Sequence, residues 1–149
     1  MRWRWSVHLM HHRARLRLAE GDPDQALVWS EQELEAATRS GARKLIARGH
    51  ELRGRILLSM DQRDDAEAEL ASAIAVGERI EYKTTLWRAR SLLAEIARRR
   101  GDGTGHQREI ATALQWIEQL APGVPAGGPR NDFDRLATRI AEDPLGAVR

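Results

Sequence analysis

The stretch ARLRLAEGDPDQALVWSEQEL, residues 14–34, predicts two helices joined by a tight polar turn. Gly21 can adopt the left-handed conformation that commonly ends a helix. Asp22 suits the N-cap of the next helix, and Pro23 suits its first position because a proline there loses no helical hydrogen bond. Gln25 has the spacing from Asp22 that is typical of a capping box. These features predict an antiparallel helical hairpin.

The same pattern returns at an offset of forty residues when Gly21, Asp61 and Gly101 are aligned. One position in the first helix of each repeat is always small. One further position in the first helix and one in the second helix are always aliphatic. The small residues are Ala14, Gly54 and Ala94, and the aliphatic sets are Leu16, Ile56 and Ile96, and Leu34, Ile74 and Leu114. A small residue lets the two helices of a hairpin approach closely. This agreement without gaps predicts three copies of one helical hairpin.

The fold class predicted from these repeats is all-α. The repeats span about 3–40, 43–80 and 83–120, within a domain of residues 1–120. The expected helices are about Trp3–Glu20, Pro23–Arg39, Arg43–Met60, Asp64–Ile80, Lys83–Arg100 and a sixth that is capped by Thr104 and Gln107 and ends near Leu120. Residues 121–130 are rich in Pro and Gly and predict a linker. Residues 131–149 predict a C-terminal capping helix with a short tail, because the last repeat leaves an apolar face to cover.

Composition narrows the class of protein. Hydrophobic residues make up 42% and charged residues 31% of the 149 residues, which is typical of a globular chain. No Cys is present, so disulfides and thiolate metal sites are excluded. We find neither a signal peptide nor an apolar run of membrane-spanning length, and we expect a cytoplasmic protein that does not contact a membrane. The net charge of +2 is small for a nucleic-acid-binding protein.

The repeats resemble the tetratricopeptide family. The residues that carry this resemblance are Ala26, Leu27, Ser30 and Leu34 in the first repeat and Ala66, Leu70, Ala73 and Ile74 in the second. A forty-residue repeat is similar to the longer repeats of bacterial signal-transduction ATPases, adenylate-cyclase-linked regulators and ATP-binding transcription activators. The resemblance implies antiparallel helical hairpins stacked as a short right-handed α-solenoid. It also implies a scaffold that binds proteins, and a chain that could be the C-terminal fragment of a larger regulator.

In proteins of this type the first helix of each hairpin, here called the A helix, lines the concave face, and the second is the B helix. The resemblance therefore implies partner-binding residues at nine positions: His8, His11 and Arg15, then Arg48, Glu51 and Arg55, then Arg88, Ser91 and Glu95. Basic residues are in excess in this set, so we expect an acidic peptide or partner domain, held by charge-assisted hydrogen bonds. We expect Arg48, Arg55 and Arg88 to be solvated before a partner binds.

Other clusters favour structural roles. His8, His11 and His12 lack further ligands, so we expect no metal site and no cofactor. We expect Glu31, Glu33 and Glu35 to be exposed, and the five Trp residues to serve mainly in packing. Ser30, Ser59, Ser72 and Ser91 lie inside helical patterns without a base nearby, so we expect no enzyme activity.

Two other functions stay open. Arginine-rich segments at the N-terminus and at Arg98, Arg99 and Arg100 could contact nucleic-acid phosphates in a regulatory fragment. Alternatively, the chain could be a spacer or dimerisation arm that forms a homo-oligomer. Steep salt dependence of DNA binding would favour the first, and concentration-dependent sedimentation would favour the second.

Overall fold

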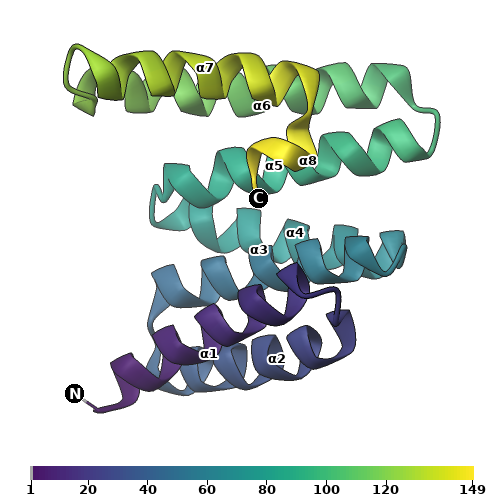
Figure 1. The fold of residues 1–149 in the computed structure, drawn as a ribbon, viewed down its shortest axis with the longest axis vertical. Coiled ribbons are helices and arrows are strands. Elements are labelled where there is room, and N and C mark those ends of the chain that lie inside the picture. Colours follow the sequence, from purple (N-terminus) through teal and green to yellow (C-terminus); the bar gives the residue numbers. More distant parts are fainter. Residues whose placement is uncertain (1) are drawn as a thin grey trace. The chain divides into compact units, whose positions relative to one another are not determined.

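The computed structural model describes residues 2–149, with side chains from residue 5 on, and this part of the chain is entirely helical apart from its turns. Figure 1 shows the helices in chain order. They are α1 (Arg2–Ala19), α2 (Pro23–Ser40), α3 (Arg43–Ser59), α4 (Arg63–Arg79), α5 (Lys83–Arg99), α6 (Gly103–Leu120), α7 (Gly128–Glu142) and α8 (Pro144–Ala147), with the 3₁₀ turn η1 (Ala121–Gly123). The predicted all-α fold class is confirmed.

One turn chemistry recurs between the helices. Residues 21, 41, 61, 81 and 101 all have positive φ, although Asp61 and Glu81 are not glycines. Within the hairpins, the amide N–H groups of Asp22, Gln62 and Asp102 donate to carbonyls five residues back, at 2.9–3.0 Å. This is the Schellman arrangement that satisfies the last carbonyls of a helix. The forty-residue register found in the sequence therefore holds for the backbone.

The third hairpin turn corrects one sequence prediction. The N-cap of α6 is Asp102, whose carboxylate accepts a hydrogen bond from the Gly105 amide at 2.8 Å, and the predicted cap at Thr104 is wrong. Asp22 caps α2 in the same way, accepting from the Gln25 amide at 3.1 Å. An aspartate directly after the left-handed glycine reaches the free amides of the first helical turn. The third turn therefore follows the first.

The chain divides into two compact units, residues 1–80 and 81–149. Unit 1 holds the hairpins α1–α2 and α3–α4, and α2 packs against α3. Its core includes Ala14, Ala26, Leu52 and Ile56, surrounded by Leu18, Leu27, Trp29 and Met60. A Cβ atom added at Gly54 would lie 2.8 Å from Leu70, so the small residue there permits the close approach of α3 and α4.

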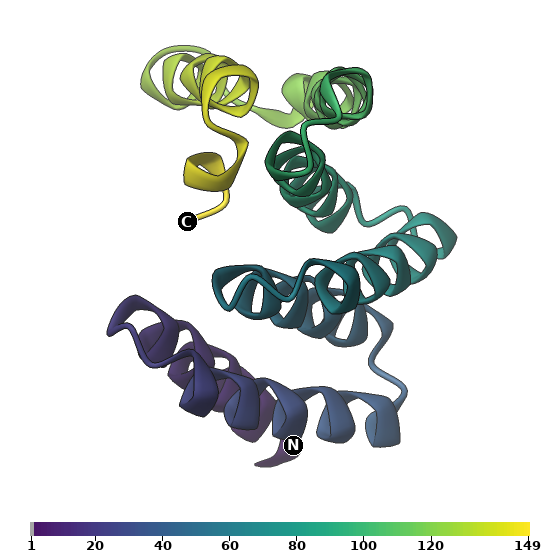
Figure 2. The same cartoon turned by 90° about the vertical axis from the view of Figure 1, so that its right-hand side faces the viewer.

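Unit 2 holds the hairpin α5–α6, with α7 against α6 and α8 against both α5 and α7. Figure 2 shows the C-terminal segment turning back after α7. The apolar residues Ile140 and Val148 are fully buried. How the third hairpin stacks on the second, and whether the A helices form one continuous concave face, stay predictions.

The tryptophans differ in their surroundings. Trp87 is buried, whereas Trp5 is 79% exposed, so the packing role expected for Trp5 is wrong. Trp29 is half-buried beneath Arg13, whose guanidinium carbon lies 4.6 Å from the ring centroid. Trp116 is also half-buried, and the side chain of Trp3 lies outside the described residues.

Candidate binding site

Alternate helices of unit 1 carry opposite charge. The A helix α1 contains five arginines and no carboxylate, and the A helix α3 contains four arginines and a lysine against one glutamate. The B helix α2 carries four carboxylates against one arginine, and the B helix α4 carries five carboxylates against two arginines. Arg48 and Arg53 of α3 form ion pairs with Glu33 and Glu31 of α2, and Arg53 also pairs with Glu69 of α4. The small net charge of the chain therefore conceals two strongly basic helices.

Four of these polar groups meet where α1, α2 and α3 come together. The Nδ1 atom of His11 lies 2.9 Å and 3.1 Å from the two carboxylate oxygens of Glu33, which is fully buried. An Nη atom of Arg48 lies 3.9 Å from the same carboxylate and 3.2 Å from Nδ1 of His8. A carboxylate only accepts, so Nδ1 of His11 is the donor in its bond. The buried negative charge of Glu33 is thus offset by groups from two neighbouring helices.

Glu33 corrects the expectation for the acidic run of α2. Glu31 and Glu35 have exposed side chains, at 69% and 66%, but Glu33 is buried. It lies in the same helix as the buried residues Ala26, Ser30 and Ala37, at spacings of three and four that define one face. The face that packs on α1 and α3 therefore includes a charge, which the sequence pattern alone did not indicate.

His8 is held in its neutral form. Arginine can only donate, so in the Arg48–His8 hydrogen bond Nδ1 of His8 is the acceptor and carries no proton. Burial lowers the pKa of His8 below its usual value of 6.5, and the positive charge of Arg48 lowers it further. Residues 8 and 48 hold the same register position in successive repeats, and their contact shows that α1 and α3 lie side by side.

A surface pocket of about 400 Å³ opens beside His8 in unit 1. Its other lining residues are Ala42, Arg43, Lys44, Leu45 and Ile80, from the start of α3 and the end of α4. Ala42 provides no side-chain cap for α3, and the first turn of α3 contains no acidic residue. Two cations and the apolar side chains of Leu45 and Ile80 thus line a pocket at a helix N-terminus, and neither cation is among the binding residues predicted from the sequence.

The remaining site residues predicted in unit 1 are distributed differently. Arg15 is exposed, Arg55 is half-buried and Glu51 is only 4% exposed. Arg48 is half-buried and bonded to His8, so the expectation that it is solvated is wrong. Its Nε atom is buried without a hydrogen-bond partner among the described residues. His8, His11 and Arg48 are therefore brought together, and Arg15 is the predicted residue most open to solvent.

Two ion pairs between A and B helices were not predicted from the sequence. Nδ1 of His50 lies 2.6 Å from a carboxylate oxygen of Glu69, and an Nη atom of Arg90 lies 3.1 Å from a carboxylate oxygen of Glu109. Positions 50 and 90, and positions 69 and 109, are forty residues apart. In both hairpins a basic residue of the A helix and an acidic residue of the B helix stand at the same two register positions. This repetition was the sequence signal that could have revealed both contacts.

In unit 2 the C-terminal segment lies on the A helix α5. Arg88 donates a hydrogen bond to the carbonyl oxygen of Val148 at 2.8 Å, and its guanidinium stands 5.6 Å from the ring centroid of Trp87. Ser91 is buried and donates to the Trp87 carbonyl. The expectation that Arg88 is solvated is therefore wrong, because the end of the chain provides its acceptor.

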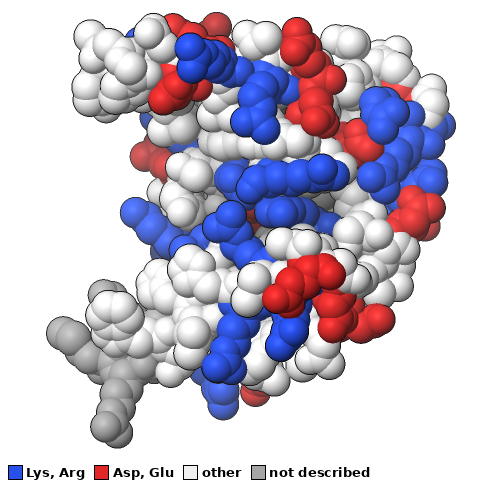
Figure 3. All heavy atoms as spheres, viewed as in Figure 1, with Lys and Arg blue, Asp and Glu red and all other residues white. Residues whose placement is uncertain are grey.

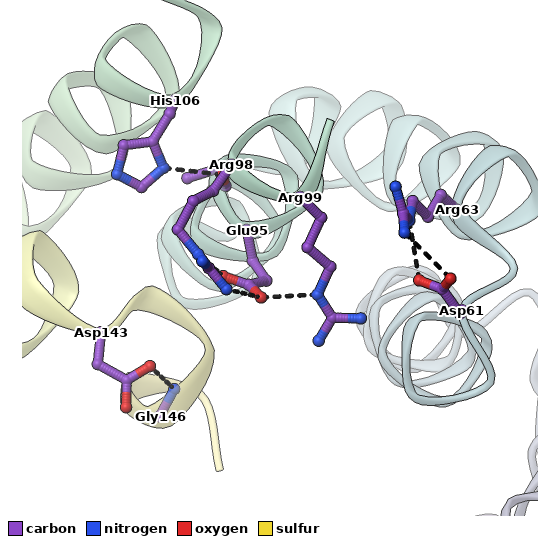
Figure 4. Close-up of polar contacts among 9 residues, drawn as sticks. Asp61, Arg63, Glu95, Arg98, Arg99, His106, Asp143 and Gly146 are labelled. Carbon is purple, nitrogen blue, oxygen red and sulfur yellow. Dashed lines mark hydrogen bonds and ion pairs between the residues drawn. The ribbon is translucent and has the colours of Figure 1, made fainter. Parts of the chain in front are cut away.

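Glu95 completes the predicted set and lies beneath two arginines (Figure 4). Arg98 donates two hydrogen bonds of 2.8 Å to its carboxylate, and Arg99 donates one of 2.7 Å. The bonds from Arg98 hold the pKa of Glu95 below its usual value, against the opposing effect of burial. The negative charge of Asp143 also interacts with Arg98. The carboxylate of Asp143 accepts a hydrogen bond from the Gly146 amide and so caps α8.

The described residues offer neither a metal site nor a membrane span. No group of three or more His, Asp or Glu side chains among them is arranged to hold a metal ion. Of the three histidines considered as metal ligands, His8, His11 and His12, His11 is hydrogen-bonded to Glu33 and His12 is exposed. Over the same part of the chain, no helix combines the length and apolar character needed to cross a bilayer.

Comparison with known proteins gives no family. No protein-family model matches the chain, and no match was found among curated proteins or solved structures. What the site can do is therefore inferred from its own chemistry.

Proposed function

We propose that this chain is a protein-interaction module of the tetratricopeptide type that binds an acidic segment of another protein through its A helices. The pocket beside His8 carries this proposal. Its cations, Arg43 and Lys44, would receive carboxylates, and Leu45 and Ile80 would receive an apolar side chain. Charge-assisted hydrogen bonds of this kind are among the stronger polar contacts in recognition.

The placement of the two cations supports binding rather than stability. The N-terminus of a helix carries partial positive charge, so basic residues in the first turn destabilise it by about 0.3–1 kcal/mol each. α3 nevertheless begins with Arg43 and Lys44 and lacks a capping side chain. An anion bound there would interact favourably with the cations and with the free amides of the first turn.

The C-terminal segment of unit 2 offers a second support. Residues 144–148 are a short piece of chain that lies on α5 through buried apolar residues and the bond from Arg88 to a backbone carbonyl. An A helix of this protein can therefore hold a peptide segment by the same combination of arginine and apolar contact. We propose that unit 1 uses it for a segment from outside the chain.

Selection of phage-displayed peptides of about 12 residues on the immobilised full chain tests the proposal. The expected sequences combine Asp or Glu with a neighbouring Leu or Ile. The double substitution Arg43→Glu and Lys44→Glu should weaken binding of the selected peptides by about a hundredfold or more, because each of the two lost charge-assisted bonds contributes about 1.5–3 kcal/mol.

The control substitution is Arg39→Glu. Arg39 has a 73% exposed side chain at the end of α2 and does not line the pocket, so its change should leave peptide binding intact. Selected peptides without acidic residues, or equal loss of binding in the control, would reject the acidic-segment proposal. Tighter, steeply salt-dependent binding of a single-stranded DNA oligonucleotide that requires Arg43 and Lys44 would assign the pocket to nucleic acid instead.

A further inference from the structure

The helix α1 has a second apolar face, on the side opposite the core. Trp5, Leu9, His12 and Leu16 follow one another at intervals of four, three and four residues, which places them on one side of a helix. Trp5 is 79%, Leu9 53% and Leu16 56% exposed, and His12 is also exposed. We call these four residues the α1 outer face. Large exposed apolar side chains in a contiguous row mark interaction surfaces.

The repeat register identifies the corresponding face on α3. Forty residues on, the same positions are Leu45, Gly49, Leu52 and Ile56. Leu52 and Ile56 are buried in the core with Ala14 and Ala26 of the first hairpin. A Cβ atom added at Gly49 would lie 3.2 Å from the Leu34 side chain of α2. On α3, therefore, this face is covered by the preceding hairpin and its acidic B helix.

The charges beside the two faces also correspond. Arg53 of α3 lies 3.8 Å from Glu31 of α2, and Arg48 lies 3.9 Å from Glu33. The equivalent positions on α1 are Arg13 and His8. Arg13, Arg15 and Arg17 flank the α1 outer face, and α1 contains no acidic residue. The arginines beside two such faces would repel each other, so this face is poorly suited to bind a second copy of α1.

We propose that the α1 outer face binds an acidic amphipathic helix of a partner protein, which lies on the same side of α1 as α2 does of α3 but further out, because Leu9 stands where α3 has Gly49. The partner helix presents an aliphatic residue with carboxylates beside it, as α2 does with Leu34, Glu31 and Glu33. Leu9 and Leu16 receive the apolar residue, and Arg13 receives a carboxylate. In Figure 3 the part of α1 next to the grey N-terminal residues is mostly uncharged surface, with Lys and Arg side chains beside it.

The probe is a fluorescent peptide of residues 22–41, which is the α2 sequence with its caps, titrated with the full chain by fluorescence anisotropy. The expected result is saturable binding at low salt. The double substitution Leu9→Asp and Leu16→Asp should weaken it by about tenfold or more, since anchors at an interface carry most of its affinity. Both side chains are more than half exposed, so the melting temperature of this variant should stay within about 2 °C of the parent.

Three controls distinguish the α1 outer face from binding elsewhere on the chain. Val28→Asp alters an aliphatic residue of α2 that is 45% exposed and should leave binding unchanged. A peptide with Leu34→Asp should not bind. The Arg43→Glu and Lys44→Glu variant should bind the peptide as the parent does, so failure of the pocket proposal is distinguishable from failure of this one.

The proposal is overturned if the peptide does not bind, or if it binds the Leu9→Asp and Leu16→Asp variant equally well. The second result would mean that the peptide exchanges with α2 on α3. It is also overturned if vesicles of phosphatidylserine and phosphatidylcholine bind the outer face more tightly than the peptide, because the face would then be a membrane anchor. Concentration-dependent dimerisation that is abolished by the same double substitution would assign the face to a second copy.

Discussion

Gly54 faces Leu70 across the α3–α4 hairpin, and no side chain fits between them. A Cβ atom there would lie 2.8 Å from both Cγ and Cδ2 of Leu70 and 3.3 Å from the Ala66 carbonyl oxygen. Cγ is not the free end of the side chain, so Leu70 cannot turn away without losing its own buried position. The equivalent residues Ala14 and Ala94 are fully buried as well. This register position is therefore buried in every hairpin, and in the second hairpin it has room for glycine alone.

Gly54→Leu is accordingly expected to lower the free energy of unfolding by at least about 2 kcal/mol, because an overpacked core forces strained rotamers or a shift of the backbone. A denaturant titration followed by circular dichroism measures this. Gly103→Ala is the matched control, since nothing lies within 4 Å of a Cβ added in the first turn of α6. Equal stability of Gly54→Leu and the parent would show that α3 and α4 do not approach as described.

A second residue-scale prediction concerns Glu95. Its folded pKa is lowered mainly by the hydrogen bonds from Arg98, so the folded state favours the carboxylate more than the unfolded state does. The stability that this group contributes is fully present above its unfolded pKa of about 4.5 and is lost as the pH falls through the lower folded pKa. The parent should therefore be more stable than Glu95→Gln at pH 7, and the difference should shrink as the pH falls below about 4.5.

Urea titrations of both proteins between pH 7 and pH 3 measure that difference. Glu35→Gln is the control, because Glu35 has a 66% exposed side chain and its ion pair with Arg39 is long, at 3.8 Å. A gap between parent and Glu95→Gln that stays constant over the whole range would mean that the arginines do not stabilise the charged form.

At the scale of helices, local chemistry was sufficient to predict most of the architecture. Residues with positive φ recur every twenty residues, and Asp22 and Asp102 cap the second helices of the first and third hairpins. The turn residues of the sequence predicted the six hairpin helices to within a few residues. α7 starts at Gly128, inside the predicted linker, because Pro129 is compatible with the first turn of a helix. Gly103 and Gly105 make the third turn differ from the first in sequence, and the predicted capping box at Thr104 and Gln107 differs from the observed cap at Asp102.

The candidate site was predicted less completely, because its contacts join residues far apart in sequence. The His11–Glu33 pair spans 22 residues, and the Arg88–Val148 bond spans 60. Periodicity places His11 on a helix, but it cannot say which side chain of the next helix will face it. The exposed α1 outer face was not predicted either, because Leu16 aligns with the buried residues Ile56 and Ile96, and the sequence pattern does not separate an exposed from a buried residue at this position.

At the scale of the whole molecule, the end of the chain packs within unit 2. α8 packs on α5 and α7, Asp143 caps it, and Arg139 donates to the Gly146 carbonyl at 2.8 Å. Val148 is fully buried, and its carbonyl accepts from Arg88. Unit 1 has its own core and its own polar cluster, so loss of these last residues should affect the two units unequally.

Deleting residues 144–149 is therefore expected to destabilise unit 2 by about 2–4 kcal/mol, because buried Val and Pro side chains and two arginine–carbonyl bonds are lost together. Hydrogen exchange followed by mass spectrometry on the full-length and shortened chains measures each unit separately. Amides of α5–α7 should exchange faster in the shortened chain, and those of α1–α4 should be unchanged. Deleting only Arg149, which is exposed, is the control and should alter neither unit. Faster exchange throughout α1–α4 would instead mean that the two units unfold as one cooperative body, and unchanged exchange in α5 would mean that the C-terminal segment does not stabilise the helix on which it lies.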